Sequence, residues 1–402
     1  MSGAPATSSG RLPRGVWALG VVSLLMDISS EMIHSLLPVF LVSVLGASAA
    51  VVGLIEGIGE GTASITRLFS GSVSDRLGRR KALTVVGYGL GALSKPWFAF
   101  APSAGWVLAA RFSDRLGKGI RGAPRDALIA DLVPAPLRGA AFGLRQSLDT
   151  VGAFAGPLLA LALMEVTAND FRRVFLLAGI PGLAAVAVLV LAVREPAVAR
   201  PRAARAPVRR AELARLGRPF WILVALAVVM TLSRFSEAFL VLRARDAGLG
   251  TALVPLVLVL MNVVYAAAAY PAGKLSDRID RRWLLVAGLL VLVLADALLA
   301  AAPGLPLVLA GVGIWGLHLG LTQGVLAALV VDAAPVEARG TAFGLLNFAT
   351  GVALLGASLV AGELWQTRGP AATFLAGLVL AAVALGGSLA LTLRRPPGVH
   401  LL

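Results

Sequence analysis

Segments of about 20 mainly apolar residues follow one another along almost the whole chain. An α-helix rises 1.5 Å per residue, so a segment of this length crosses the ~30 Å hydrocarbon core of a bilayer. The sequence therefore predicts an all-α membrane protein, and the alternating strands of roughly ten residues that form an outer-membrane barrel are not seen. The twelve predicted spans are 15–44, 49–70, 82–101, 104–124, 139–164, 173–193, 218–242, 252–273, 283–302, 305–331, 340–362 and 371–393.

Composition supports a lipid environment. Of the 402 residues, 58% are hydrophobic and only 14% are charged, whereas a soluble domain carries about 25% charged residues. In water such a chain would expose large apolar patches. The first apolar segment is longer than the core of a signal peptide, so we expect it to be retained as the first span. The sequence contains no cysteine, which excludes disulfides, thiolate zinc sites and cysteine nucleophiles.

Basic residues mark one side of the predicted bundle. Segments 76–81 and 274–282 are strongly basic, and segment 194–218 holds eight arginines, whereas 45–50, 102–105 and 302–305 contain no Lys or Arg. The positive-inside rule predicts that the basic segments and both termini are cytoplasmic, as in a multi-pass protein of the cell (inner) membrane. The net charge of +15 then follows from topology, and we expect no nucleic-acid partner. Five arginines fall on the other predicted side: Arg172, Arg173, Arg243, Arg245 and Arg368.

The chain contains an internal duplication. GSVSDRLGRR at 71–80 returns as GKLSDRIDRR at 273–282, which is 202 residues later. Segment 127–144 returns at 328–345, which is 201 residues later, with 10 of 18 positions identical. Duplicated halves around a central site are a known plan of transporters. We expect a cytoplasmic tail at 1–14, a six-helix bundle at 15–193, a basic Pro/Arg-rich linker at 194–217, a second six-helix bundle at 218–393 and a cytoplasmic tail at 394–402.

The first copy of the decapeptide resembles the loop motif of the major facilitator superfamily, G-x-x-x-D-R-x-G-R-R. The resemblance covers essentially the whole chain and implies two pseudo-symmetric halves of six helices, with this loop closing the cytoplasmic side in the outward-open state. In the second copy, Asp280 stands where the motif has glycine. The predicted gate residues are Gly71, Asp75, Arg76, Gly78, Arg79 and Arg80, and Gly273, Asp277, Arg278, Arg281 and Arg282.

A second resemblance lies in the fifth span, in the sequence GAFAGP. Gly152, Gly156 and Pro157 are similar to the antiporter signature of the same superfamily, which is associated with drug:proton exporters. The alternative is ordinary packing, since small residues let helices approach closely and proline kinks a helix.

Charged residues inside the spans are the candidate site, because a charge at the bilayer centre costs at least ~2.5–3.5 kcal/mol. In the first span, Asp27, Ser30, Glu31 and His34 share one helical face. The resemblance implies that spans one, four, seven and ten line the substrate cavity, and that an arginine of span four is often paired with an acid of span one. Arg111, at the depth of Asp27, is our first choice for this arginine.

Arg115, which fits the pattern R-x-x-x-G-x-x-G, remains the second choice. Burial disfavours the charged form of a carboxyl, and a neighbouring arginine favours it. An acid that is both buried and close to an arginine experiences these two opposing effects. It can take up and release a proton as the cavity opens and closes. Asp27 is our first candidate for the proton carrier and Glu31 the second, and His34 could share the work. The alternative is a fixed structural pair of Asp27 and Arg111.

Other interior polar residues extend the predicted site. Arg234 and Glu237 in span seven, with Ser233, and Trp315 and His318 in span ten, with Gln323, would form the opposite wall of the cavity. His318 could equally make an interhelical hydrogen bond. Glu56 and Glu60 favour structural pairs with Lys95 or Arg67. Arg145, Gln146 and Asp149 in span five could likewise either belong to the site or form structural pairs.

These features predict a secondary transporter and not an enzyme, since no catalytic motif or P-loop is present. We expect a monomer without cofactors that exports a small polar or amphiphilic solute in exchange for protons. Uptake by proton symport and uniport of an organic ion are the alternatives. A divalent metal exporter using Asp27, Glu31 and His34 is disfavoured by the nearby arginine. The duplicated halves favour alternating access over a channel.

Overall fold

The computed structural model describes residues 12–77, 79–134, 137–195, 215–276, 278–335 and 338–393, and all regular elements in these residues are helical. The predicted C-terminal tail and most of the predicted N-terminal tail and linker lie outside the described residues. The first half contains α1 (Arg14–His34), α2 (Leu37–Val39), a π-helical turn (Phe40–Val44), α3 (Ala49–Leu77), α4 (Arg80–Ala99), α5 (Ala104–Leu132), α6 (Arg138–Val166) and α7 (Phe171–Ala192). The second half contains α9 (Arg218–Ser233), α10 (Ala238–Asp246), a 3-10 turn (Thr251–Leu253), α11 (Pro255–Ser276), α12 (Arg281–Ala301), α13 (Leu305–Ala333), α14 (Arg339–Arg368) and α15 (Pro370–Leu393).

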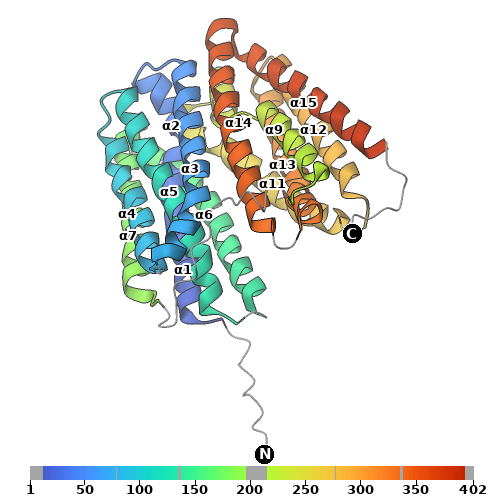
Figure 1. Ribbon diagram of the computed structural model, residues 1–402. Coiled ribbons are helices and arrows are strands. Elements are labelled where there is room, and N and C mark those ends of the chain that lie inside the picture. Colours follow the sequence, from blue (N-terminus) through green and yellow to red (C-terminus); the bar gives the residue numbers. More distant parts are fainter. Residues whose placement is uncertain are drawn as a thin grey trace, which may run out of the picture.

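Nine helical segments of the described chain are long and apolar enough to cross a membrane. Helices α3, α4 and α5 have 29, 20 and 29 residues, so they are also long enough, but charged and polar side chains reduce their hydropathy. The two halves, coloured blue to green and yellow to red, stand side by side as two bundles (Figure 1). The predicted all-α architecture of two six-span halves is therefore confirmed.

Helices α3 and α14 form the main contact between the halves, and glycines allow it. A Cβ atom on Gly53 would lie 2.2 Å from the carbonyl oxygen of Ser358, and one on Gly362 would lie 2.7 Å from the carbonyl oxygen of Ala49. Further along, Gly351 faces the side chain of Ser64 in the same way. The backbones of the two helices therefore touch along a seam that only glycine permits.

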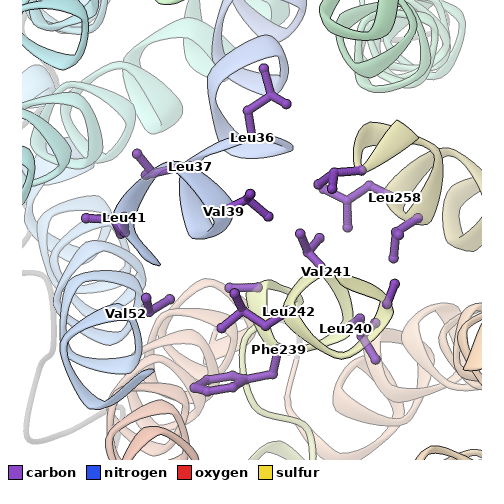
Figure 2. Packing of buried hydrophobic residues seen from close by; sticks show 14 of the residues in the cluster. Leu36, Leu37, Val39, Leu41, Val52, Phe239, Leu240, Val241, Leu242 and Leu258 are labelled. Carbon is purple, nitrogen blue, oxygen red and sulfur yellow. The ribbon is translucent and has the colours of Figure 1, made fainter. Parts of the chain in front are cut away.

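One end of the molecule is closed by a core that both halves share. We call it the far end; it holds the loops at 45–48, 100–103 and 302–304. Figure 2 shows Val39 of the first half next to Val241 of the second, with Leu36 and Leu37 on the segment of Val39 and Leu242 on the helix of Val241. These side chains are at most 6% exposed and belong to one continuous apolar cluster.

The opposite end, called the basic end, holds Arg80, Lys81, Arg281 and Arg282. Here the buried apolar residues form separate clusters. One contains only residues of α1 and α4–α7 with their flanks, and two others contain only residues of the second half. The halves thus share a hydrophobic core at the far end and not at the basic end, apart from the α3–α14 seam. The structure is a state closed at the far end.

The first and seventh spans are both interrupted near the far end. Helix α1 ends at His34, and the short helix α2 begins at Leu37 with Pro38 in its first turn, a position that proline fits. Helix α9 ends at Ser233, and Arg234–Glu237 is irregular before α10 begins. No proline or glycine marks this second break. The hydroxyl of Ser233 donates to the carbonyl of Met230 (2.7 Å), one of the orphan carbonyls at a helix end.

The α3–α14 seam gives a first prediction. We expect Gly53→Ala to lower the midpoint of thermal unfolding, because the new methyl group meets backbone atoms that cannot move aside, at a cost of about 1–3 kcal/mol or more. Gly89→Ala in α4 is the matched control, because a Cβ there meets nothing within 4 Å and alanine is the better helix former. Intrinsic tryptophan fluorescence during heating in detergent measures both. Equal midpoints for the two variants would contradict the close contact.

Candidate functional site

The interior of the first half holds a dense group of ionised side chains, centred on α5. Arg111, Asp114 and Arg115 are 2–4% exposed, and Lys95 and Glu56, on α4 and α3, are 1% exposed. The spacing of three and four residues in α5 directs Arg111, Asp114 and Arg115 toward α3 and α4. Buried charges are tolerated only when they are paired, so these contacts fix how the three helices pack.

Both arginines of α5 pair with acids of α3. The guanidinium of Arg111 donates to Glu56 Oε2 at 2.7 Å, and Arg115 lies 3.2 Å from Glu60 Oε1. The pairing of Arg111 with Asp27 that the sequence suggested is not found; α3 supplies the partner instead. Arg111 and Arg115 are the partners of Glu56 and Glu60, in place of the expected Lys95 or Arg67.

Lys95 has a different partner. Its ammonium donates to Asp114 Oδ1 at 2.8 Å and to the hydroxyl of Ser30 at 3.1 Å. Ser30 belongs to the predicted face of α1, so this face is tied to α4 and α5 through Lys95. The pair of Lys95 and Asp114 is almost completely shielded from solvent, with side chains 2% and 5% exposed.

His34 bridges two acids from different helices. Its Nδ1 lies 3.4 Å from Oε2 of Glu31, one turn earlier on α1, and its Nε2 lies 3.5 Å from Oε2 of Glu56 on α3. Glu31 is 23% exposed and His34 is 14% exposed, whereas Glu56 is 1% exposed. An imidazole with a carboxylate at each nitrogen can accept a proton on one side and release one on the other. The chain from Glu31 through His34 to Glu56 therefore leads from a solvated group to a buried one.

Glu56 also reaches the second half. The hydroxyl of Ser236, in the break between α9 and α10, donates to Glu56 Oε2 at 3.5 Å. The backbone N–H of Ser236 in turn donates to the hydroxyl of Ser358 on α14 (3.3 Å). One carboxylate thus contacts Arg111 of α5, His34 of α1 and the interrupted seventh span.

Asp27 occupies a different environment from the acids above. Its side chain is partly exposed and has no hydrogen-bond or ion-pair partner among the described residues. The backbone of α6 approaches α1 at this point. A Cβ on Gly152 would lie 2.8 Å from Cβ of Asp27, and one on Gly156 would lie 2.6 Å from Cβ of Glu31. The two glycines of the antiporter-like motif therefore pack directly on the two candidate proton carriers, with Pro157 buried beside them.

Three further charged groups have no direct partner in the described chain: the exposed Lys118 on α5, and the partly exposed Arg234 and Glu237 in the break of span seven. Glu237 lies within electrostatic range of His34, Glu31 and Glu60 across the boundary between the halves. The sequence had identified Arg234 and Glu237 but not Lys118. The signal was present, because Lys118 follows Arg111 and Arg115 at the seventh and third positions of one helical face.

The candidates of span ten are buried in the second half. Trp315 is 1% exposed, and its indole N–H has no partner in the structure. His318 is also 1% exposed, and its Nδ1 lies 2.8 Å from the carbonyl oxygen of Gly288 on α12. This is the interhelical hydrogen bond that the sequence offered as the alternative to a substrate contact.

The duplicated loop motifs form equivalent ion pairs inside each half. Arg80 pairs with Asp131 of α5, and Arg281 pairs with Asp332 of α13 at 2.6 Å. Arg281 and Asp332 lie 201 residues after Arg80 and Asp131, although the loop motif, at an offset of 202, aligns Arg80 with Arg282. Asp280, which replaces the glycine of the motif, accepts the backbone N–H of Arg282 at 3.0 Å and caps α12. Gly78 and Asp277 lie outside the described residues, as do the side chains of Asp75 and Arg76. Gly71, Arg79, Gly273 and Arg278 lie at the basic end.

Arg145 in span five makes an ion pair within its own helix. Its guanidinium donates to Asp149 Oδ2 at 2.5 Å and to the side-chain oxygen of Gln146 at 3.0 Å. It also lies 4.0 Å from Asp126 on α5. These residues form a polar lining of α6 toward the basic end. The described residues contain no group of three or more His, Asp or Glu side chains placed to hold a metal ion.

Comparisons with known proteins agree on one family. The family model described as Major Facilitator Superfamily matches residues 19–261 and 235–401. An MFS-type transporter of Methanocaldococcus jannaschii is 33% identical over 92% of this chain and 93% of its own length. The multidrug resistance protein MdtH of Aeromonas hydrophila is 28% identical and covers 82% of each chain.

Solved structures share the fold. A bacterial homologue of the lysosomal transporter Spinster, in an inward-facing and unoccupied conformation, has a TM-score of 0.77 and 16% identity, covering 95% of this chain and 98% of that one. A POT family transporter has a TM-score of 0.80 at 13% identity, with 95% and 96% coverage.

The buried pair of Glu56 and Arg111 gives the second prediction. We expect Glu56→Gln to destabilise the protein by about 3–5 kcal/mol, because it leaves a buried guanidinium without its counter-charge. Replacing both partners, Glu56→Leu with Arg111→Met, should recover most of that loss. Thermal unfolding in detergent measures the three variants.

Asp170→Asn is the control, because its ion pair with Arg173 is at the surface, with side chains 36% and 73% exposed, and such pairs contribute at most about 1 kcal/mol. A Glu56→Gln midpoint equal to that of Asp170→Asn would show that the pair is not required for folding.

Proposed function

Because the chain belongs to the major facilitator superfamily and is a transporter of that family, we propose that it exports a small charged or amphiphilic organic solute by alternating access, in exchange for protons. The observation that carries this proposal is the chain of titratable groups from Glu31 through His34 to Glu56, which ends at the boundary between the halves. The likeness to the multidrug resistance protein MdtH and the packing of Gly152 and Gly156 on α1 support the direction of transport.

The proton path begins at the more exposed end of this series of titratable side chains. Asp27 has no basic partner that would hold it ionised by direct contact, so it can titrate as the first proton carrier. Glu31, the second candidate, lies one turn further along α1 and already contacts His34. The imidazole can take a proton at Nδ1 and pass one from Nε2 to Glu56.

Protonation of Glu56 would couple the proton to the movement of the halves. A neutral carboxyl holds Arg111 less strongly than a carboxylate does, and it weakens the long hydrogen bond from Ser236. Loss of these contacts frees the break of span seven from the first half. Arg111 and Arg115 would act here by positioning the acids, since both are buried against α3.

The charged side chains without partners indicate the chemical class of the solute. Lys118 and Arg234 offer positive charge, and Asp27 and Glu237 offer negative charge, on opposite sides of the boundary between the halves. The buried core of the second half is mainly apolar and includes Trp315. A solute with an anionic group and an apolar body would satisfy the first half through Lys118 and the second half through its apolar surface. A divalent cation would have Arg111 and Arg115 close by and is disfavoured.

The loop motifs would close the basic end in the alternate state. In the present state their arginines are bound within their own halves, to Asp131 and Asp332. When the basic end closes, these loops approach each other, and exchange of such solvent-exposed pairs needs little free energy. We place the basic end and both termini in the cytoplasm, on the inner membrane, with the domain boundaries expected above and a monomer as the transporting unit.

Proton movement linked to transport tests this proposal. In liposomes with an internal pH dye and an imposed pH gradient, addition of a charged amphiphile should trigger proton flux with the wild-type protein. We expect Asp27→Asn to abolish that flux while leaving the unfolding midpoint near that of wild type, because Asp27 has no ion pair to lose. Asp170→Asn is the matched control and should keep full flux.

Flux that persists in Asp27→Asn would assign the proton to Glu31, and Glu31→Gln would then be expected to abolish it. A solute that is transported while no proton moves in any of these proteins would overturn proton coupling.

A further inference from the structure

The second half contains one acid that the mechanism above does not use. Asp296 of α12 is completely buried, and neither of its carboxyl oxygens has a hydrogen-bond partner among the described residues. A buried carboxyl without a partner is costly. A hydrogen-bond donor or a positive charge would stabilise this carboxyl, and the described side chains supply neither.

A second unsatisfied acceptor approaches the same side of Gly377 as Asp296. A Cβ on Gly377 of α15 would lie 2.8 Å from Oδ2 of Asp296 and 3.1 Å from the carbonyl oxygen of Ser233. Ser233 is the last residue of α9, and no described N–H donates to its carbonyl. Because Gly377 has no side chain, the carboxyl, the carbonyl and the ring of Phe235, whose Cε1 would also lie 3.1 Å from that Cβ, pack against its backbone. The aligned peptide dipoles of α9 add partial negative charge at this end of the helix.

The charged groups on the neighbouring elements do not neutralise Asp296. Helix α15 carries none within Pro370–Leu393. The guanidinium of Arg243 on α10 donates instead to the carbonyls of Leu299 and Ala302 at 2.9 and 2.7 Å. The remaining titratable or charged side chains of α9, α11, α12 and α13 and of the break make no bond to Asp296: Arg218, Arg234, Glu237, Tyr265, Tyr270, Lys274, Arg281, Arg282, His318 and Asp332.

We propose that Asp296 and the carbonyl of Ser233 form a binding site for a small monovalent cation, a proton or a sodium ion, behind the break in span seven. A proton on Asp296 would let its O–H donate to the carbonyl of Ser233. A sodium ion would be held by the same carbonyl and both carboxyl oxygens, in the manner of cation sites at the ends of interrupted membrane helices. Either ion supplies the positive charge that these acceptors lack.

The site is placed to act on the boundary between the halves. Three residues after Ser233, the hydroxyl of Ser236 donates to Glu56 of the first half. A cation on one face of the break fixes the backbone that makes this contact on the other face. We therefore expect bound cation to stabilise the state closed at the far end. The inference rests on the proposed function only where it identifies this cation as a coupling ion.

Unfolding midpoints of the purified full-length protein test the site. They are measured with sodium chloride against choline chloride at constant ionic strength, and between about pH 5.5 and 8.5 without sodium. If the site binds sodium, sodium chloride should raise the wild-type unfolding midpoint above its value in choline chloride. If the site binds a proton, lowering the pH without sodium should raise it. Asp296→Asn keeps the shape of the side chain without its charge, so the part of the rise that comes from this site should be lost. Asp246→Asn, at a surface acid that is 50% exposed, should keep the full rise.

A second pair of variants leaves the acid in place. Gly377→Ala puts a methyl group into the proposed site and should also remove the rise, whereas Gly386→Ala on the same helix meets nothing within 4 Å and should keep it. A rise with sodium that is lost in both site variants identifies sodium, and a rise with acidity alone identifies the proton. The proposal is overturned if wild type responds to neither ion, or if Asp296→Asn and Gly377→Ala respond like wild type.

The proton flux of Asp27→Asn is a separate readout, because Asp27 lies on α1 in the other half. If wild type moves no proton but the midpoint still depends on Asp296, the proposed proton exchange fails while the cation site stands. If the flux depends on Asp27 and the midpoint does not depend on Asp296, the cation site fails while proton exchange stands.

Discussion

Charge inside a bilayer must be paired, and this requirement organises the first half of the molecule. Arg111 and Arg115 project from α5 onto Glu56 and Glu60 of α3, and Lys95 of α4 binds Asp114. Each pair joins two helices that the apolar residues alone would leave free to rotate or slide, because lipid and leucine are equally apolar surroundings. The pairs therefore supply the specificity of packing here, and the energy that they store becomes available when a proton removes one charge.

The two interrupted spans connect this charged half to the apolar one. Span one breaks after His34 and span seven after Ser233, both close to the shared apolar core of the far end. Irregular backbone at membrane depth is tolerated where it is covered by protein. The breaks place His34 and Ser236 on the two sides of Glu56. A change in the charge of one carboxylate thus reaches both halves without any long chain of intermediates.

The architecture could be predicted from the sequence because it depends on composition and period. Twelve apolar segments and a duplication at offsets of 202 and 201 residues lead to two six-span halves, which the structure confirms. Pairings could not be predicted in the same way. Asp27, Glu56 and Glu60 are all acids at a plausible depth for Arg111, and only the rotation of α3 against α5 decides among them. The break after Ser233 escaped prediction because no proline or glycine marks it. Lys118 was within reach, since its spacing from Arg115 was visible.

The asymmetry between the halves suggests a division of labour within a duplicated fold. Their loop arginines still make the same ion pairs, Arg80 with Asp131 and Arg281 with Asp332, so the parts that hold each bundle together have been kept. The interiors have diverged, since the first half holds the network of paired charges, whereas the core of the second half holds Asp296, a completely buried acid without a hydrogen-bond partner in the described chain. A network of pairs can exchange partners in small steps, whereas a lone buried acid has only an occupied and an unoccupied state. The first arrangement suits a path for protons, and the second suits a switch that responds to one ion.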